Sequence, residues 1–200
     1  MLHPHRFLRL ALSSALAAAS LAVASPAMAA SPCGDQPVSQ PFLTFLDPAQ
    51  YTPVGDAGLE QGGAGWTLSS AATIVDDQEP WLVGGSTDER ALELPAGASA
   101  VTPPLCVTLA HPDAKLFARS TGLVGLLLVD VVVRDGGLLQ ELPAGVVTPT
   151  AFWSPSLPLL LLASLTTPLT GGSADVQLRL TSLLGTVRVD DVYVDPYKPI

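Results

Sequence analysis

The fold is decided by residues 187–194, which read Val-Arg-Val-Asp-Asp-Val-Tyr-Val. The first two valines share one phase of a two-residue alternation, and the last two valines share the other phase. Because successive side chains of a strand point to opposite faces of a sheet, this alternation predicts a half-buried β-strand. The phase changes at Asp190-Asp191, which predicts a β-bulge or a change of exposure at that point.

Similar short runs recur along the rest of the chain. Apolar and polar side chains alternate in residues 105–109 and again in 176–180, as in strands with one face in a core. Residues 123–133 predict a central strand with a partly covered outer face, and residues 157–165 predict a buried strand. Proline and glycine, at 19 and 17 residues, interrupt the longer runs and leave no helical period. The pattern predicts an all-β domain, a two-sheet β-sandwich of the jelly-roll type.

The N-terminus has the features of an export signal. Two arginines near the start precede an Ala-, Leu- and Ser-rich run over residues 10–23, and small residues follow up to Ala29. This order predicts a secretory signal peptide over residues 1–29 and a secreted, extracellular protein. The apolar run is shorter than the roughly 20 residues of a membrane-spanning helix, so we expect no membrane span once the signal is removed. We expect an N-terminal arm over residues 30–45 and the β-sandwich domain over residues 46–200.

The charge balance restricts the class of partner. Acidic residues outnumber basic ones by 18 to 9, for a formal net charge of −9. This excludes nucleic acids and anionic membrane surfaces, because both need basic patches. A cation suits the chain better: Glu60 in a glycine-rich loop and Asp190-Asp191 could supply the oxygen ligands that Ca²⁺ prefers. The alternative is that these acidic side chains are only solvated.

The chain has two cysteines, Cys33 and Cys106. In the oxidising environment that an export signal implies, an even pair predicts one disulfide between the arm and a strand. Such a bond closes a long loop and would stabilise the fold by about 4 kcal/mol on the chain-entropy model. Two free thiols are the alternative.

Catalytic chemistry has little support in the sequence. After removal of the signal one histidine remains, His111, which we expect to be a solvated loop residue. There is no Gly-x-Ser-x-Gly elbow for a nucleophile, and too few histidines and cysteines to hold zinc. A small glycoside hydrolase is the least favoured alternative, because nothing singles out a facing pair among the candidate acids. Those candidates are Glu60, Glu79, Glu89, Glu93 and Glu141.

Two tryptophans are candidates for ligand contact. Trp81 lies between Pro80 and Leu82 in an acidic, loop-like region, and Trp153 lies next to Ser154-Pro155. Exposed aromatic rings can stack on a sugar, because they present an apolar face and, in tryptophan, a polar edge. Burial in the core is the alternative for both.

Two motifs carry a resemblance to a known family. The segment Gly58-Leu59-Glu60-Gln61-Gly62 precedes Gly65-Trp66, and Asp190-Asp191-Val192 lies in the last strand. Together they resemble the opening and closing strands of galactose-binding-like jelly rolls, which include many carbohydrate-binding modules. The chain also resembles a group of small secreted actinobacterial-type proteins. The resemblance implies a structural calcium ion held by Glu60 and by Asp190 or Asp191, but it identifies no sugar-binding aromatic residues.

The sequence therefore favours a secreted, non-catalytic binding module for a polysaccharide or a cell-envelope glycan, with a structural calcium ion. This hypothesis requires exposed aromatic side chains over a shallow groove. The alternative is an extracellular structural or protein-interaction domain, which requires an exposed apolar patch instead.

Overall fold

The structure is a computed structural model that describes residues 33–135, 138–162 and 172–196. Residues Ser31–Ile200 form one compact unit. The predicted signal peptide lies outside the described residues. Within the described part of the chain, no helix is both long enough and apolar enough to cross a membrane.

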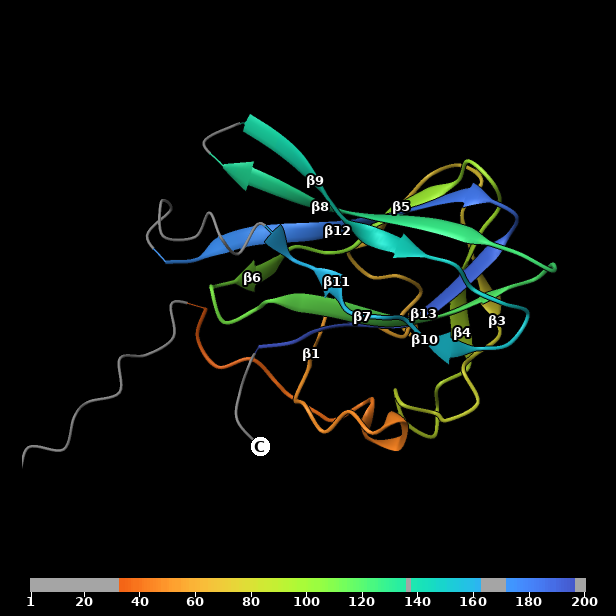
Figure 1. Ribbon diagram of the computed structural model, residues 1–200, viewed down its shortest axis with the longest axis horizontal. Coiled ribbons are helices and arrows are strands. Elements are labelled where there is room, and N and C mark those ends of the chain that lie inside the picture. The colour runs from red at the N-terminus through yellow and green to blue at the C-terminus, as the bar shows by residue number, and fades with distance from the viewer. Residues whose placement is uncertain (1–32, 136–137, 163–171, 197–200) are drawn as a thin grey trace, which may run out of the picture. The chain divides into compact units, whose positions relative to one another are not determined.

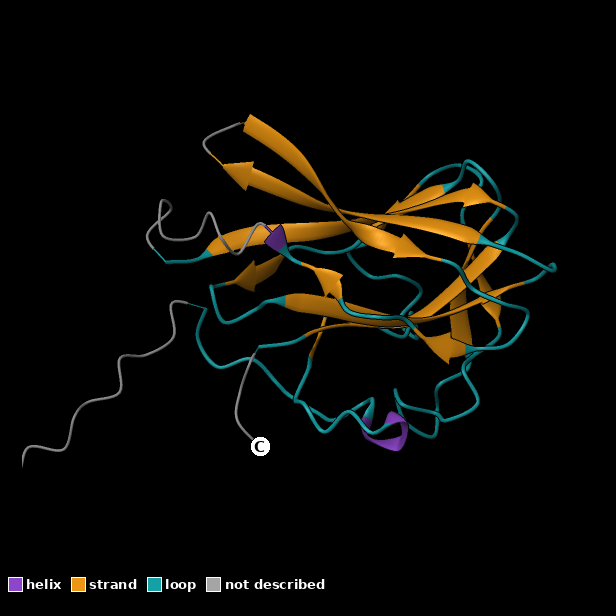
Figure 2. Cartoon of the chain, in the orientation of Figure 1, coloured by secondary structure: helices purple, strands orange, loops and turns teal. Residues whose placement is uncertain are grey.

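Two antiparallel sheets lie face to face, as Figures 1 and 2 show. A single short 3-10 turn, η1 (Leu43–Phe45), is the one helical element with assigned bounds in the described residues. The 7-stranded sheet has the order β10 (Ser154–Pro155), β7 (Asp113–Ser120), β13 (Val187–Val194), β4 (Arg90–Leu94) and β3 (Thr73–Asp76), with β1 (Thr52–Pro53) paired to β13 and β11 (Leu159–Leu160) to β7. The 6-stranded sheet has the order β2 (Thr67–Leu68), β5 (Ser99–Val101), β12 (Ala174–Leu184), β8 (Leu126–Asp135) and β9 (Leu138–Val147), with β6 (Leu105–Val107) paired to β12. The predicted all-β, two-sheet β-sandwich is confirmed.

The core forms where the alternating strands point their apolar faces inward. Val176, Leu178 and Leu180 of β12 are all buried, and they lie in one cluster with the inward side chains of β4 and β13. Each such side chain contributes about 1.5–3 kcal/mol to folding when it leaves water. The strand predicted around residues 123–133 is β8, which lies between β12 and β9.

One predicted strand is largely wrong. Within the described residues 157–162, only Leu159–Leu160 form a strand, and Leu157 is exposed. Proline has no backbone N–H to donate to a ladder, so Pro158 delays the start of pairing until the next residue. Residues 163–165 lie outside the described residues.

The predicted irregularity in the last strand is a β-bulge. The pairing of β13 with β7 shifts register between Asp190 and Tyr193, and Asp191 adopts a left-handed backbone with φ of 51°. Every residue from Val189 to Val194 is buried, because the main core covers one face of this part of the strand and the aromatic cluster of the arm covers the other. A bulge places two residues where the partner strand has one, and here it brings two carboxylates inside the fold.

The N-terminal arm covers the outer side of the 7-stranded sheet, below the strands in Figure 1. The ring of Phe42 is fully buried and stacks on Phe117 of β7, with ring centroids 5.2 Å apart. Tyr51 and Tyr193 complete this aromatic cluster. The arm therefore adds a second, aromatic core outside the sandwich.

The arm is also tied to the 6-stranded sheet. The predicted disulfide between Cys33 and Cys106 is present, with a Cα–Cα distance of 5.5 Å. Gln36 donates a hydrogen bond to the carbonyl of Cys106 at 2.9 Å, and its side-chain oxygen lies 3.1 Å from Nε2 of His111. His111 is buried rather than solvated, because its other ring nitrogen accepts the backbone N–H of Thr108. The expectation of a solvated histidine was wrong.

Removal of the disulfide should lower stability substantially. The double variant Cys33→Ser/Cys106→Ser frees a loop with a sequence separation of 73 residues, so we expect its free energy of unfolding to fall by about 4 kcal/mol. Urea titration of the mature protein measures this change. Alkylation of two thiols in the unreduced parent protein, detected by intact mass, would contradict the bond itself.

A partly buried carboxyl at the start of β7 predicts a pH dependence of stability. Oδ1 of Asp113 is buried without a hydrogen-bond partner, and burial, followed by the charge of Asp195, raises the pKa of Asp113 to about 6. Folding therefore favours the protonated form, and stability falls as the pH rises from about 4, the unfolded value, to about 6. At pH 8 we expect the free energy of unfolding of Asp113→Asn, measured by urea titration, to exceed that of the parent by about 1–2 kcal/mol. The partial exposure of Asp113 keeps this difference below the full effect of its shifted pKa. The variant should match the parent below pH 4, whereas the exposed Asp175→Asn should differ at neither pH.

Candidate functional site

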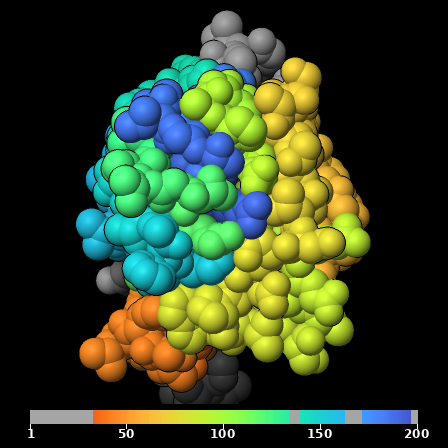
Figure 3. All heavy atoms as spheres, turned by 90° about the vertical axis from the view of Figure 1, so that its right-hand side faces the viewer, coloured from red at the N-terminus to blue at the C-terminus, as the bar shows by residue number. Residues whose placement is uncertain are grey.

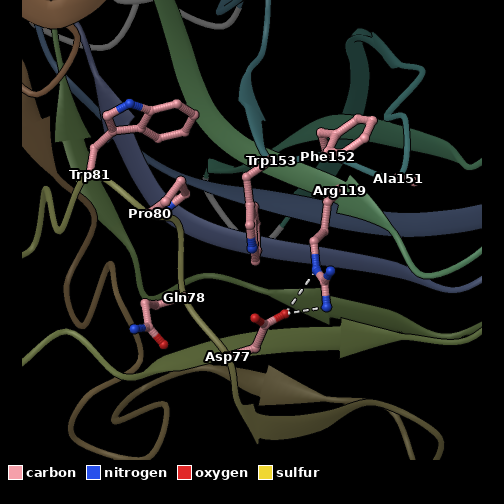
Figure 4. Close-up of a pocket in the computed structure, with 8 residues that line it drawn as sticks. All are labelled: Asp77, Gln78, Pro80, Trp81, Arg119, Ala151, Phe152 and Trp153. Atoms are coloured by element: carbon pink, nitrogen blue, oxygen red, sulfur yellow. Dashed lines mark hydrogen bonds and ion pairs between the residues drawn. The ribbon is translucent and has the colours of Figure 1, made fainter.

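An open groove lies on the outer side of the 7-stranded sheet. Two loops build it: residues 77–81, directly after β3, and residues 151–153, directly before β10. Figure 3 shows these two loops, in yellow and cyan, side by side on one face. The groove has a volume of about 410 Å³ and is drawn in Figure 4. Its lining residues are Asp77, Gln78, Pro80, Trp81, Arg119, Ala151, Phe152 and Trp153.

The groove brings together the two tryptophans singled out in the sequence. Trp81 is 38% exposed, and its buried side packs edge-on against Phe45 of the arm, with ring centroids 4.7 Å apart. Trp153 is partly buried, and the guanidinium of Arg119 lies 5.7 Å from its ring centre. Both indoles are therefore held in place by neighbours while part of each faces the groove.

Phe152 is the most exposed aromatic residue of the groove, at 80%. The sequence analysis did not identify it, because a single phenylalanine before a tryptophan carries no local signal of exposure. A large apolar side chain that remains in water is costly to leave there unless something covers it. The loop before β10 thus offers an open apolar surface next to the partly buried Trp153.

Polar groups border these rings. Nε and Nη2 of Arg119 lie 2.9 and 2.8 Å from Oδ2 of Asp77, as the dashed lines in Figure 4 indicate. The same oxygen accepts a hydrogen bond from Arg188 at 2.8 Å, and Arg188 also pairs with Glu93. These contacts fix the side chains of Asp77 and Arg119 at the groove, where an arginine retains further donors and an aspartate further acceptor positions.

The carboxylates of the groove do not form a hydrolytic pair. Asp77 is the one carboxylate among the described residues that line the groove. Of the glutamates considered as acids, Glu93 pairs with Arg188, Glu141 pairs with Arg179, and Glu79 is fully buried. Glycoside hydrolysis needs two carboxyl groups on opposite sides of the bond, and this groove does not offer them.

A second candidate site lies next to the loop of residues 77–81, which follows β3. Carboxylate oxygens of Glu79, Asp88 and Asp191 all lie within 4.8 Å of one another, and all three residues are buried. Asp191 comes from the bulge in β13, whereas Glu79 and Asp88 come from the loop between β3 and β4. We call these three residues, together with the adjacent Asp190, the acidic cluster.

The three metal ligands predicted from the sequence, Glu60, Asp190 and Asp191, lie at different positions relative to this cluster. Asp191 belongs to it, and Asp190 borders it, with Oδ2 accepting the backbone N–H of Glu79 at 3.1 Å. Glu60 accepts the backbone N–H groups of Glu89 and Arg90, each at 2.8 Å, and its charge helps to raise the pKa of the neighbouring Asp88. Glu79 and Asp88 were not identified as ligands from the sequence.

The cluster holds negative charge that the backbone N–H groups around it compensate only in part. Both side-chain oxygens of Asp191 and Oδ1 of Asp88 are buried with no hydrogen-bond partner. Burial, followed by the charges of neighbouring carboxylates, raises the pKa of Asp190 and of Asp191 strongly. Burial is also the main reason that the pKa of Asp88 rises to about 6. The cluster is therefore stable only if protons or a cation neutralise it.

Two glycines lie next to the carboxylates of the cluster, where a side chain would crowd them. A Cβ atom at Gly84 would lie 3.1 Å from Oδ2 of Asp88, and one at Gly58 would lie 3.4 Å from Oδ1 of Asp191. Because these two positions are glycines, no side chain crowds the carboxylate oxygens. Oxygen ligands without nitrogen or sulfur are the set that Ca²⁺ and Mg²⁺ prefer.

Comparison with known proteins gives matches in structure alone. No family model and no curated protein sequence matches the chain. The fold is similar to the CBM22-1–GH10 modules of xylanase 10B from Clostridium thermocellum, solved with xylohexaose, at 11% identity and a TM-score of 0.48 over 66% of this chain. The chain spans about a quarter of that protein, 26% of its length.

Two isolated modules match over more of their own length. One is the carbohydrate-binding module TmCBM61, solved with β-1,4-galactotriose, at 15% identity and a TM-score of 0.40 over 70% of this chain and 94% of the module. The other is the CBM22-2 xylan-binding domain of Xyn10C from Paenibacillus barcinonensis, at 11% identity and a TM-score of 0.45 over 70% and 96%. A domain of another kind is also similar in fold: the enzymatically active domain of tailspike protein 4 from bacteriophage CBA120, at 13% identity and a TM-score of 0.44 over 71% of this chain and 21% of that one.

Proposed function

We propose that the chain is an exported, non-catalytic carbohydrate-binding module that holds a polysaccharide in the groove between Trp81 and Phe152. The observation that carries this proposal is the convergence of three aromatic side chains and one fixed ion pair on a single open groove. Sugar rings have apolar C–H faces and polar edges, so they need aromatic surfaces flanked by hydrogen-bonding groups.

The groove supplies both kinds of contact. Phe152 and the open side of Trp81 would stack on sugar faces, while Asp77, Gln78 and Arg119 would meet hydroxyl groups at the ring edges. Asp77 and Arg119 neutralise each other, and this favours an uncharged polysaccharide over an acidic one. Because the groove is open at the surface, it suits an extended chain.

We further propose that the acidic cluster binds a structural calcium ion through Glu79, Asp88 and Asp191, with Asp190 and Glu60 beside it. The buried oxygens without partners support this assignment, because a divalent cation would compensate their charge. The ion would join β13 to the loop that carries Trp81.

Export is the remaining part of the proposal. The signal-like sequence of residues 1–29 supports it, and so does the Cys33–Cys106 disulfide, since such bonds persist mainly in oxidising compartments. A secreted module without catalytic groups would act by attaching to a glycan outside the cell.

A protein-interaction domain is the second candidate function. Phe152 and Leu157 are 80% and 85% exposed and are close in sequence, so the loop around β10 presents apolar side chains beyond the groove. A protein partner would use both residues, whereas a sugar in the groove would use Phe152 and leave Leu157 free.

Substitution of Phe152 tests these readings. We expect the purified mature protein to be retained on at least one matrix of a panel of insoluble xylan, galactan and cell-wall polysaccharides. Phe152→Ala should weaken that retention about tenfold, since one lost stacking contact is worth roughly 1 kcal/mol or slightly more. Trp153→Ala should act in the same direction. Phe152 is chosen because its exposure makes misfolding of the variant improbable.

Leu157→Ala is the matched control, because Leu157 is equally exposed but does not line the groove. It should leave retention unchanged. No retention of the parent on any matrix would favour the protein-interaction domain, and equal losses in the two variants would contradict the assignment of glycan binding to the groove.

Calcium should raise the melting temperature. When free Ca²⁺ exceeds its dissociation constant a hundredfold, binding adds about 2.7 kcal/mol of stability. Asp191→Asn should abolish this increase and, in chelator, should melt above the parent because it removes a buried uncompensated charge. The exposed Asp76→Asn serves as the control and should respond to calcium like the parent. Identical melting of the parent in calcium and in chelator would refute the site.

A further inference from the structure

We propose that the acidic cluster controls the groove: cation binding at Glu79 positions Trp81 and thereby strengthens ligand binding. This inference rests on the proposed function of both sites. It assigns to Glu79 the role of a positioning residue, which acts on the ligand through Trp81.

One short segment serves both sites. Gln78, Pro80 and Trp81 line the groove, as Figure 4 shows, whereas Glu79 is fully buried and its carboxylate faces Asp88 and Asp191. Neighbouring residues in the chain thus point into two different sites. Any movement of Glu79 must be transmitted to Trp81 through two peptide units.

The carboxylate of Glu79 also holds the turn that carries Trp81. Its Oε2 accepts the backbone N–H of Trp81 at 2.5 Å, and its Oε1 accepts the backbone N–H of Val83. Hydrogen bonds from backbone N–H groups to an ionised carboxylate are stronger than those to a neutral acceptor. The backbone of the segment therefore depends on the position of this one side chain.

Besides Glu79, the rings of Phe45 and Phe117 also contact the segment, with centroids 4.7 and 5.6 Å from that of Trp81. Pro80, Trp81 and Leu82 are all exposed, and Leu82 adopts a left-handed backbone with φ of 52°, which a branched side chain rarely does. Leu82 lies between the two N–H groups that Glu79 binds. A strained residue of this kind persists only while its surroundings hold it, and here the hydrogen bonds to Glu79 on either side and the bond from the N–H of Gly85 to the carbonyl of Leu82 hold it.

The negative charge of the cluster connects cation binding to the hydrogen bonds that Glu79 accepts from Trp81 and Val83. Without a cation, Glu79 lies beside Asp88 and Asp191 with their carboxylate oxygens within 4.8 Å, and these like charges repel one another in a buried place. Displacement of Glu79 would relieve the repulsion, and it would weaken the hydrogen bonds that Glu79 accepts from Trp81 and Val83. A bound cation turns repulsion into attraction and keeps Glu79 in place.

The segment is held to the cluster at two further points. The backbone N–H of Glu79 donates to Oδ2 of Asp190, and the N–H of Gly84 donates to Oδ2 of Asp88 at 3.3 Å. Ligation of these aspartates would therefore fix both ends of the segment as well. By thermodynamic reciprocity, ligand in the groove should tighten cation binding by the same factor.

Fluorine NMR of the full mature protein labelled with 5-fluorotryptophan gives a direct test, because the chain has three tryptophans. The resonances of Trp66, Trp81 and Trp153 are assigned by single substitutions to phenylalanine. Calcium chloride alone, added to protein freed of metal by chelator, should shift or sharpen the Trp81 resonance more than that of Trp153. Glu79→Gln should lose this Trp81 response, whereas Glu141→Gln, on the other sheet, should keep it.

The second measurement is retention on xylan and galactan matrices in calcium and in chelator. We expect chelator to weaken retention of the parent about tenfold, within the usual range of coupling between sites. Glu79→Gln should bind equally weakly in both conditions. A Trp81 response in Glu79→Gln equal to that of the parent would overturn the role of Glu79.

The remaining outcomes separate this inference from the proposed function. A calcium-dependent rise in melting temperature without any change at Trp81 would overturn the coupling and leave the cation site standing. Retention that is equal in calcium and in chelator would overturn the coupling and leave the glycan-binding function standing. No response to calcium in either melting or NMR would remove both the cation site and the coupling.

Discussion

The bulge in β13 is the constraint on which both sites depend. β13 lies inside the 7-stranded sheet, paired with β7 on one side and with β4 on the other, and an undisturbed strand there would turn alternate side chains to the two faces. The register shift after Asp190 instead interrupts this alternation at two consecutive carboxylates, in a stretch of the strand that is buried throughout. Buried charge of this kind is unfavourable without compensation, so the surrounding loops must either donate hydrogen bonds or hold a cation.

The loop between β3 and β4 meets that requirement and also builds the groove. It donates the N–H of Glu79 to Asp190, adds the carboxylates of Glu79 and Asp88 to the cluster, and presents Trp81 at the surface. Two further buried carboxylates would lower the stability of the fold if nothing compensated their charge. A cation bound next to the loop that carries Trp81 would provide this compensation.

The sheet supplies the rigid part of the groove. Arg188 and Arg119 are register partners on β13 and β7, and both donate to the same oxygen of Asp77. A groove floored by neighbouring strands keeps its polar groups in fixed positions, whereas aromatic residues on loops can differ without disturbing the fold. The structure thus separates a fixed polar base from the more adaptable rings of Trp81 and Phe152.

The sequence by itself determined the features that depend on neighbours along the chain. Alternation in residues 176–180 predicted a strand, the phase change at Asp190-Asp191 predicted the bulge, and the two cysteines predicted their bond, since each of these is a local pattern or a pairing with one solution. Trp81 and Trp153 were candidates because of their polar and proline-rich surroundings.

Tertiary structure alone decided which of these residues meet. Glu79 and Asp88 have no local mark that separates them from solvated acids, and they become members of the cluster because their loop folds over the bulge of a strand about 100 residues later. Asp77 and Arg119 meet for the same reason. A site made from distant segments is specified by the pairing of strands and the path of loops, and no window of sequence contains that information.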